Sequence, residues 1–257
     1  MLNTFPRTFT AVVAGSSRGI GLALVRELLA SDRVELVIAC ARATGDSVGL
    51  QALGEQYGAR LERFEVDMTR ASTIAGAAER LKAARIRPHL VLNVAGLLHD
   101  EAVGLTPEKR LEDIDPAALE RVFAVNTVGP AMMLRHFLPL MSRDGKAVFA
   151  ALSARVGSIS DNRLGGWYAY RSSKAALNQM LKTASIEARR RFSNLIIAAL
   201  HPGTTDTDLS APFQANVPNG KLFTQQFVAQ RLLAVIDGLS SDDSGGFFAW
   251  DGQVVPW

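Results

Sequence analysis

The chain of 257 residues contains a single cysteine, Cys40, and this scarcity excludes two classes of structure. A lone cysteine cannot form a disulfide within the chain, and it cannot build a four-cysteine zinc site. Histidines are also few, and His201, which precedes Pro202, has no neighbouring His, Asp or Glu at a spacing typical of metal ligands. We therefore expect no metal, and we expect His201 to serve packing or hydrogen bonding.

The sequence also lacks long apolar runs and a strong charge bias. No run approaches the roughly 18–20 apolar residues of a membrane-spanning helix, and residues 1–10 lack the basic and apolar stretches of a signal peptide. Lys plus Arg number 28 and Asp plus Glu number 25, so the net charge is only +3. So small a surplus does not favour nucleic acid as a partner. We expect a cytoplasmic protein that binds neither membranes nor nucleic acid.

What the sequence does contain is a regular alternation of short apolar runs and longer amphipathic stretches. The runs are near-continuously apolar, as is typical of strands covered on both faces, and they lie at residues 10–14, 34–40, 61–66, 89–94, 147–152, 195–200 and 246–250. Helices are expected at residues 20–29, 72–84, 116–141, 168–190 and 224–239. This order predicts an α/β fold with a parallel sheet and helices on both faces. Without a repeat or a Pro/Gly-rich linker, residues 1–257 are expected to form a single domain.

A glycine-rich loop, GSSRGIG at residues 15–21, joins the first expected strand to the first expected helix. Glycines allow a tight turn and a close approach by pyrophosphate, and the helix N-terminus offers free N–H groups. The spacing differs from Gly-x-Gly-x-x-Gly and lacks the Gly-Lys-Ser/Thr ending of a P-loop, so an ordinary turn is the alternative interpretation. Its place after the first strand favours dinucleotide binding. The expected contacts are Gly15, Ser17, Arg18, Gly19, Ile20 and Gly21.

The end of the second expected strand indicates which dinucleotide is preferred. NAD-specific sites place an acidic residue about 20 residues past the glycines, but this region reads Cys40-Ala41-Arg42. Arg42 can pair with a 2′-phosphate, and Arg18 can approach the same group from the glycine loop. The other interpretation is a pair of solvated surface arginines. We predict NADP(H) as the cofactor in preference to NAD(H).

Tyr170 and Lys174 are four residues apart on the helix expected at residues 168–190, so their side chains share one face. A free phenol has a pKa of about 10, which is high for acid/base work near neutrality. A neighbouring ammonium stabilises the phenolate and lowers that pKa. Tyr168 is the competing tyrosine, but its own i+4 partner is Ser172, which carries no charge. Taken alone, the spacing is also common among surface neighbours.

Taken together, these motifs resemble the short-chain dehydrogenase/reductase family over almost the entire chain. The resemblance is carried by the glycine loop, by NVAG at residues 93–96, by Asn126, by the Tyr170/Lys174 pair and by PGTTDT at residues 202–207. The segments RVGSI at 155–159, GGWY at 165–168 and DGQVVPW at 251–257 resemble the C-factor-like branch. The resemblance implies a Rossmann-type, doubly wound parallel sheet of about seven strands with helices on both faces.

The resemblance also implies roles for individual residues. Tyr170 would be the acid/base that exchanges a proton with the substrate oxygen, and Lys174 would lower its pKa and hold the nicotinamide ribose. Asn126 resembles the family's asparagine that holds a water linking Lys174 to solvent. Asp67 would receive the adenine, with the alternative that it caps the next helix. Further implied cofactor contacts are Asn93, Ala95 and Gly96 on the adenosine side, and Pro202, Gly203, Thr204, Thr205 and Thr207 near the carboxamide.

The polarising serine is where the sequence departs from the family pattern. The family's serine lies three residues before a glycine, and counting back from Gly157 that position is Ala154. A bulge at the strand end would return Ser153 to the site. Ser158 is the alternative. We expect Ser153 to be the serine that hydrogen-bonds the reacting oxygen.

The predicted function is NADP(H)-dependent interconversion of a carbonyl and an alcohol on a small or medium apolar substrate. The resemblance implies a homodimer or homotetramer as the assembly. One alternative is a catalytically weak, nucleotide-binding regulator or signalling protein on the same fold, which the displaced serine favours. A weaker alternative, a nucleotide-sugar epimerase or dehydratase, requires a C-terminal substrate domain for which this chain has no room.

Overall fold

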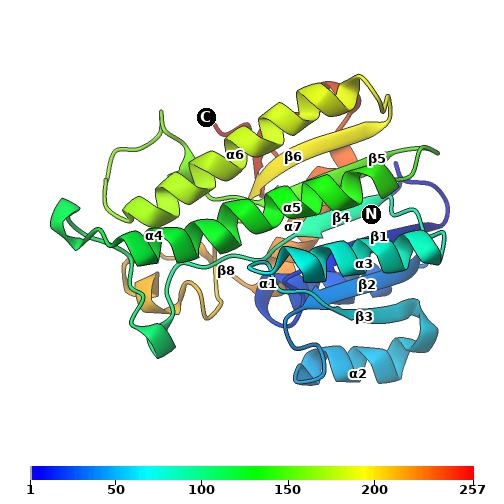
Figure 1. Cartoon of the computed structure of the whole chain (residues 1–257), viewed down its shortest axis with the longest axis horizontal. Helices are drawn as coiled ribbons and strands as arrows, with labels where there is room; N and C mark the ends of the chain where they lie inside the picture. The colour runs from blue at the N-terminus through cyan, green and yellow to red at the C-terminus, as the bar shows by residue number, and fades with distance from the viewer. Residues whose placement is uncertain (1) are drawn as a thin grey trace.

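The computed structural model describes residues 2–257. The expectation that residues 1–10 are not a signal peptide therefore lies outside the described residues at Met1. It contains a seven-stranded parallel sheet with helices on both faces (Figure 1) and the strand order β3-β2-β1-β4-β5-β6-β9. The strands are β1 Phe9–Ala14, β2 Val34–Ala41, β3 Leu61–Glu65, β4 Leu90–Asn93, β5 Ala147–Leu152, β6 Leu195–His201 and β9 Gly246–Ala249. Each lies where the sequence predicts a strand. The Rossmann-type sheet is therefore confirmed.

Seven helices of the described chain flank this sheet. They are α1 Gly19–Leu29, α2 Val48–Tyr57, α3 Ala71–Ala83, α4 Pro116–Phe123, α5 Gly129–Phe137, α6 Tyr168–Arg189 and α7 Gln225–Gly238. In β1, Ala11 and Val13 belong to the apolar cluster beneath α1, α2 and α7, whereas Val12 and Ala14 belong to the cluster beneath α3, α5 and α6. Successive side chains of a strand point to opposite faces, so an apolar run in every strand is what a sheet covered on both faces requires.

Two helical segments differ from the expectations. No helix was expected at α2, because only Leu50 and Leu53 of its ten residues are buried and its 3.6-residue apolar period is weak. The single helix expected at residues 116–141 is divided by a π-helical turn at Ala124–Val128. Pro130 explains this division, because proline lacks the N–H that would bond to the carbonyl of Asn126 four residues earlier.

The loops that follow the carboxyl ends of the strands gather at one end of the molecule, on the left in Figure 1. They include residues 94–115, residues 153–167 and residues 202–224, and the last contains a small parallel pair, β7 Thr204–Thr205 with β8 Leu222–Phe223. Open α/β sheets bind ligands at this edge. No helix within residues 2–257 combines the length and the apolar character that crossing a bilayer requires.

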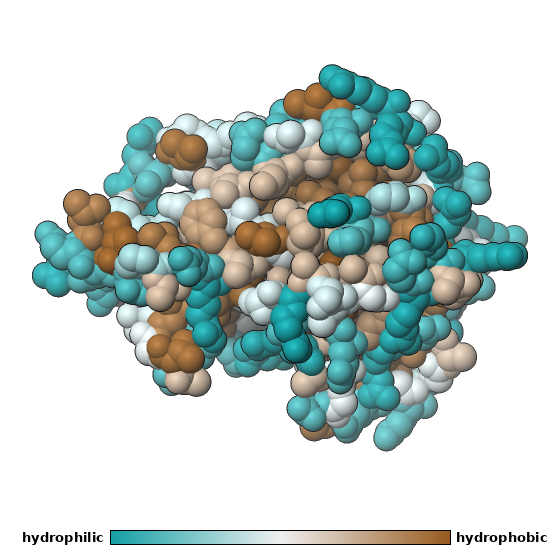
Figure 2. All heavy atoms as spheres, in the orientation of Figure 1, coloured by the Kyte–Doolittle hydropathy of each residue, from teal (hydrophilic) through white to brown (hydrophobic). Residues whose placement is uncertain are grey.

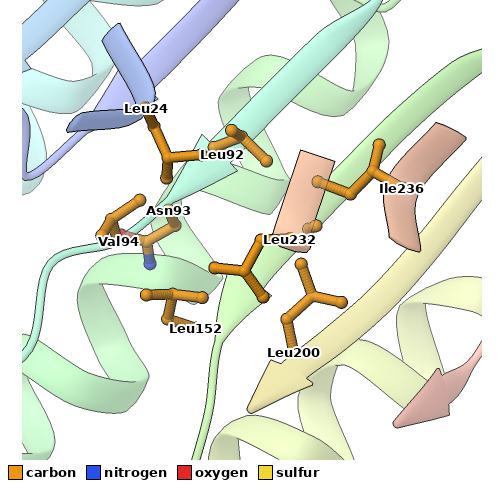
Figure 3. A pocket seen from close by; sticks show the side chains of 9 residues that line it. Leu24, Leu92, Asn93, Val94, Leu152, Leu200, Leu232 and Ile236 are labelled. Carbon is orange, nitrogen blue, oxygen red and sulfur yellow. The ribbon is translucent and has the colours of Figure 1, made fainter. Parts of the chain in front are cut away.

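A small cavity of about 10 Å³ lies between the sheet and the helices α1 and α7 (Figure 3). Its lining is almost wholly aliphatic and includes Leu24 of α1, Leu92 of β4, Leu200 of β6 and Leu232 of α7, with Asn93 at its edge. That volume barely admits one water molecule, and an apolar void of this size stays empty. The cavity is a packing gap in the core and holds neither cofactor nor substrate.

Candidate active site

The glycine loop packs tightly against the loop that follows β4. Gly15 has a φ of +82° and Gly19 a φ of +58°, both in the left-handed region that favours glycine. A Cβ atom at Gly15 would lie 2.6 Å from the backbone nitrogen of Ala95, so only glycine fits there. Arg18 precedes α1 without a side-chain cap, and the first turn of α1 has no acidic residue. The first N–H groups of α1 therefore remain available to an anion.

The ends of β2 and β3 form the next part of the predicted cofactor site. β2 ends at Ala41, and Arg42 follows it without an acidic residue at that strand end. Asp67 Oδ1 accepts hydrogen bonds from the backbone N–H and the hydroxyl of Thr69, and its other oxygen lies 3.4 Å from Arg70 Nε. Partial burial alone would raise the pKa of Asp67, but these hydrogen bonds and the charges of Arg70 and Arg42 outweigh burial and lower it.

Asp67 therefore organises the turn before α3, but it does not cap that helix: the N-cap residue is Arg70, and no side chain caps the helix start. The contact between Asp67 and adenine stays a prediction.

Arg18 makes an ion pair that the sequence did not predict. Its Nη1 atom forms an ion pair with Asp208 at 2.9 Å, and both side chains are largely exposed. Asp208 belongs to the loop after β6, so the pair joins that loop to the glycine loop. Thr207, from the same loop after β6, also lies close to the glycine loop: its methyl carbon would be 3.5 Å from a Cβ atom added at Gly19. In this structure Asp208 holds the Arg18 guanidinium, and the contact between Arg18 and a 2′-phosphate stays a prediction.

Tyr170 and Lys174 lie one turn apart on α6, and both are buried. Lys174 Nζ is 5.7 Å from the centre of the Tyr170 ring and donates a hydrogen bond to the carbonyl oxygen of Leu152 at 2.8 Å. A Cβ atom at Gly157 would lie 2.6 Å from Lys174 Cβ, so the loop after β5 lies directly against α6. The start of α6 thus places the tyrosine and the lysine side by side, and the end of β5 holds the lysine ammonium.

Burial sets the protonation of this pair. It raises the pKa of Tyr170 to about 12 and lowers the pKa of Lys174 to about 8. The expected lowering of the tyrosine pKa by the lysine is not seen, because removing both groups from water disfavours their charged forms. Tyr170 is therefore a protonated phenol at neutral pH, which suits a proton donor. Lys174 keeps its charge only below a pH of about 8.

Asn126 lies in the π-helical turn and is fully buried. Its Oδ1 atom accepts the backbone N–H of Leu97 at 2.8 Å, and its Nδ2 atom donates to the Leu97 carbonyl at 2.8 Å and to Ser173 Oγ at 3.0 Å. A Cβ atom at Gly96 would lie 3.7 Å from both Asn126 Oδ1 and Lys174 Nζ. The asparagine, Gly96 and the lysine are therefore brought together, and the water link stays a prediction.

The two candidate serines differ in what their hydroxyl groups bind. Ser153 follows β5, and its N–H bonds to the Leu200 carbonyl at 2.8 Å. β5 pairs with both neighbouring strands without a register shift as far as Leu152, so no bulge lies within β5 itself. The Ser153 hydroxyl is buried and finds no partner among residues 2–257. Ser158 Oγ instead accepts the N–H of Asp161 at 3.1 Å.

The remaining predicted cofactor residues surround the same strand ends. Asn93 closes β4, and its Oδ1 atom accepts the N–H of Ala95 at 3.3 Å. Thr204 and Thr205 form β7, and the Thr205 hydroxyl is buried without a partner in the described part of the chain. Pro202 and Gly203 form the turn between β6 and β7, where Gly203 has a φ of +74°. The geometry is compatible with their predicted roles, which no contact in the structure tests.

His201 lies at the carboxyl end of β6. His201 Nδ1 accepts the N–H of Arg155 at 3.2 Å, and burial, aided by the Arg155 charge, lowers the pKa of the imidazole to about 4. The expectation of a hydrogen-bonding histidine is confirmed. Residues 2–257 contain no group of three or more His, Cys, Asp or Glu side chains able to hold a metal ion.

Three residues beside the site were not predicted. Glu108 is a buried carboxylate whose Oε2 atom accepts the N–H of Ala169 at the start of α6 at 3.2 Å. Trp167 and Arg171 flank the same end of α6. Glu108 lies in an irregular loop with no spacing signal. From the sequence, the GGWY segment serves only the family resemblance, and Trp167 is assigned no role. The two adjacent glycines of this segment are the signal that was available, because they favour a left-handed turn.

Comparison with known proteins gives one consistent result. The family described as "short chain dehydrogenase" matches residues 9–218. "C-signal" of Myxococcus xanthus is 36% identical over 147 residues, covering 57% of this chain and 83% of that protein. "1-hydroxy-2-glutathionyl-2-methyl-3-butene dehydrogenase" of Rhodococcus sp. (strain AD45) is 29% identical, covering 96% of this chain and 99% of that protein.

Among solved structures, an NADPH-bound carbonyl reductase from chicken fatty liver superposes with a TM-score of 0.86 and 28% identity. The match covers 99% of this chain and 97% of that one. The family match covers most of the chain, and the structural match extends over its full sheet. The chain therefore belongs to the short-chain dehydrogenase family.

Proposed function

We propose that this protein is an NADP(H)-dependent oxidoreductase that interconverts a carbonyl and an alcohol on a small or medium apolar substrate. The observation that carries the proposal is Lys174, which lies beside Asn126 and Tyr170 and bonds to the carbonyl of Leu152; the next residue, Ser153, has a buried hydroxyl without a partner among residues 2–257. A buried hydroxyl without a partner is costly, so a ligand oxygen at Ser153 would remove a penalty that the protein otherwise bears.

The residues present fit a dinucleotide phosphate. The first N–H groups of α1 lack a side-chain cap, and Gly15 brings the glycine loop against the loop after β4. The strand end that would carry the acid of an NAD-specific site carries Arg42 instead. Arg42 would hold the 2′-phosphate, and Arg18 would join it after leaving Asp208. The NADPH-bound avian reductase supports this choice.

The chemistry divides between the cofactor and the chain. The nicotinamide, when bound, supplies hydride to the carbonyl carbon or accepts it from the alcohol. Tyr170 donates its phenolic proton to the carbonyl oxygen, and its raised pKa keeps that proton available at neutral pH. Ser153 donates a hydrogen bond to the same oxygen, and the Lys174 ammonium stabilises the phenolate that forms. Asn126 fixes the backbone beside Gly96 through its two bonds to Leu97.

The central test replaces Tyr170 with phenylalanine and follows NADPH oxidation with a panel of ketones and aldehydes. Tyr170→Phe removes only the hydroxyl, so we expect turnover to fall by about 10²–10⁴-fold, the usual contribution of general acid catalysis. Titration calorimetry should show unchanged NADPH affinity, and tighter binding of NADPH than of NADH. Full turnover in the variant, or tighter NADH binding, would contradict the assignment.

The serine assignment has its own test, with a matched control. Ser153→Ala should lower turnover by about 10²-fold, because the hydroxyl polarises the carbonyl. Ser158→Ala is the control, since that hydroxyl already serves the Asp161 N–H. If Ser158→Ala causes the loss and Ser153→Ala does not, Ser158 is the polarising serine.

A second candidate function is a nucleotide-binding regulator or signalling protein with weak catalysis. Two observations favour it: the relative named "C-signal", and Ala154 at the position of the family's serine. The retained Tyr170 and Lys174 favour the enzyme. A Tyr170→Phe strain separates the two functions, because a signalling role would persist in it and an enzymatic role would be lost.

A further inference from the structure

The chain takes an unusual path immediately before the helix that carries Tyr170. Gly165, Gly166 and Trp167 have φ values of +66°, +65° and +53°, so three successive residues lie in the left-handed region. Glycine tolerates this region, but a bulky tryptophan there is a genuine outlier. Such strained residues persist only where their surroundings hold them, and they concentrate at ligand sites.

Contacts from α6 and from the loop after β4 hold this turn. Arg171 Nε donates to the carbonyl oxygens of Gly165 and Gly166 at 3.1 and 2.9 Å. The Trp167 N–H donates to the backbone carbonyl of Glu108. The carboxylate of Glu108 accepts the N–H of Ala169, in the first turn of α6. The left-handed conformation of Trp167 is thus fixed by its neighbours.

The effect of this turn is to place the indole of Trp167 in an aromatic cluster beside the acid/base. The ring centres of Trp167 and Tyr170 are 6.3 Å apart with an interplanar angle of 80°, an edge-to-face arrangement. Phe213, from the loop after β6, packs on Trp167 at 4.8 Å, and His99 meets Phe213 at 5.9 Å. Trp167, Phe213 and His99 are only half-buried, so they retain open aromatic surface.

The cluster draws on three loops that converge at the carboxyl edge of the sheet. His99 comes from the loop after β4, Trp167 from the loop after β5 and Phe213 from the loop after β6. Figure 2, in the orientation of Figure 1, shows apolar groups gathered among polar ones at this end of the molecule. This edge of the fold is where the substituents of a carbonyl bound at Tyr170 must lie.

We propose that Trp167 is a specificity-determining residue, and that its ring, with Phe213, selects substrates whose carbonyl is attached to a flat aromatic ring. The inference rests on the proposed function. Aromatic rings pair edge-to-face or offset with one another at centre distances of 4.5–7 Å. A planar substrate ring can extend the existing pairs in that geometry, whereas a saturated ring of the same size gains only from burial of its surface.

The test compares benzaldehyde with cyclohexanecarbaldehyde, which have the same carbon skeleton, in the NADPH-dependent reduction. The wild-type protein should show the higher kcat/KM for benzaldehyde. Trp167→Leu should lower that value by about two- to tenfold, mainly through KM, which is the range that aromatic pairing supplies. The loss for cyclohexanecarbaldehyde should be smaller, because leucine keeps an apolar surface. Trp167→Phe should restore part of the aromatic preference.

Leu164→Ala is the matched control, since Leu164 is 92% exposed on the same loop, and it should leave both aldehydes at wild-type values. Thermal melting establishes that each variant is folded. If Trp167→Leu lowers both aldehydes equally while turnover continues, the specificity role is overturned and the proposed function stands. If the wild-type protein binds NADPH but reduces neither aldehyde nor any other carbonyl, the proposed function is overturned, and the specificity role with it.

Discussion

Tyr170 and Lys174 show how burial alone prepares two residues for opposite tasks. The raised pKa of the phenol keeps its proton in place, and the lowered pKa of the ammonium, about 8, brings its loss of charge near the physiological range. Their spacing predicted the pair, but it also suggested a depressed tyrosine pKa. The difference arises because desolvation depends on how deeply α6 is packed, which no local spacing reveals.

This pair predicts a defined pH dependence for the reduction. Because kcat/KM reports groups of the free enzyme, we expect it to be level below a pH of about 8 and to fall above it, as Lys174 loses the charge that stabilises the Tyr170 phenolate. The phenol itself stays protonated up to a pH of about 12 and does not cause the decline. Initial rates from pH 6 to 10 measure the profile. A level profile across that range would show that the lysine charge is not used.

Among the elements, the strands were predictable and two helical segments were not. Apart from β3 (LERFE), in which Glu62, Arg63 and Glu65 are exposed, the strands of the seven-stranded sheet are largely apolar on both faces, so a short β-branched run suffices to identify them. α2 buries only Leu50 and Leu53, which is too little for a periodic signal. The π-helical turn that carries Asn126 depends on Pro130 and on contacts with Leu97, which lies 29 residues earlier. Such long-range contacts leave no mark in a local pattern.

The same distinction applies to the candidate site. Motif order located Tyr170, Lys174 and Asn126, and the structure brings all three together. The Arg18–Asp208 ion pair could not be predicted, because its partners are 190 residues apart on loops of irregular sequence. Glu108 was missed for the same reason, since its role depends on where its loop meets the start of α6.

The side chain of Lys146 binds the carboxyl end of α7. Lys146 Nζ donates to the carbonyl oxygens of Ile236, Asp237 and Leu239, each at 2.7 Å, and thereby binds carbonyls that a helix end leaves without partners. Lys146→Met should lower the free energy of unfolding by about 2 kcal/mol, which is a drop of roughly 4–8 °C in Tm. Denaturant and thermal unfolding measure the two quantities.

Lys82→Met is the control for this prediction, because Lys82 is 65% exposed and its pairing with Glu79 is a surface contact. It should change the free energy of unfolding by less than about 0.5 kcal/mol. Equal effects of the two substitutions would show that capping by Lys146 contributes nothing beyond an ordinary surface charge.

At the scale of the whole molecule, the proposed cofactor site joins segments from both halves of the sheet. The glycine loop and Arg42 follow β1 and β2, whereas Thr204 to Thr207 follow β6, and the Arg18–Asp208 pair already links the two sides. A ligand that contacts all of these segments binds the folded chain and not the unfolded one. Its binding free energy therefore adds directly to the stability of the fold.

We accordingly expect NADPH, at about 100 times its Kd, to raise the free energy of unfolding by about 2.7 kcal/mol and Tm by roughly 5–10 °C. NADH at the same concentration should give a smaller shift, because it lacks the 2′-phosphate that Arg42 would pair with. Arg42→Ala should weaken NADPH binding about tenfold or more and so remove at least ~1.4 kcal/mol of this stabilisation, which brings its shift close to that of NADH. Thermal melting of both proteins with each nucleotide measures the shifts. Equal shifts with NADPH and NADH in the wild-type protein would show that the residue after β2 does not select the phosphate.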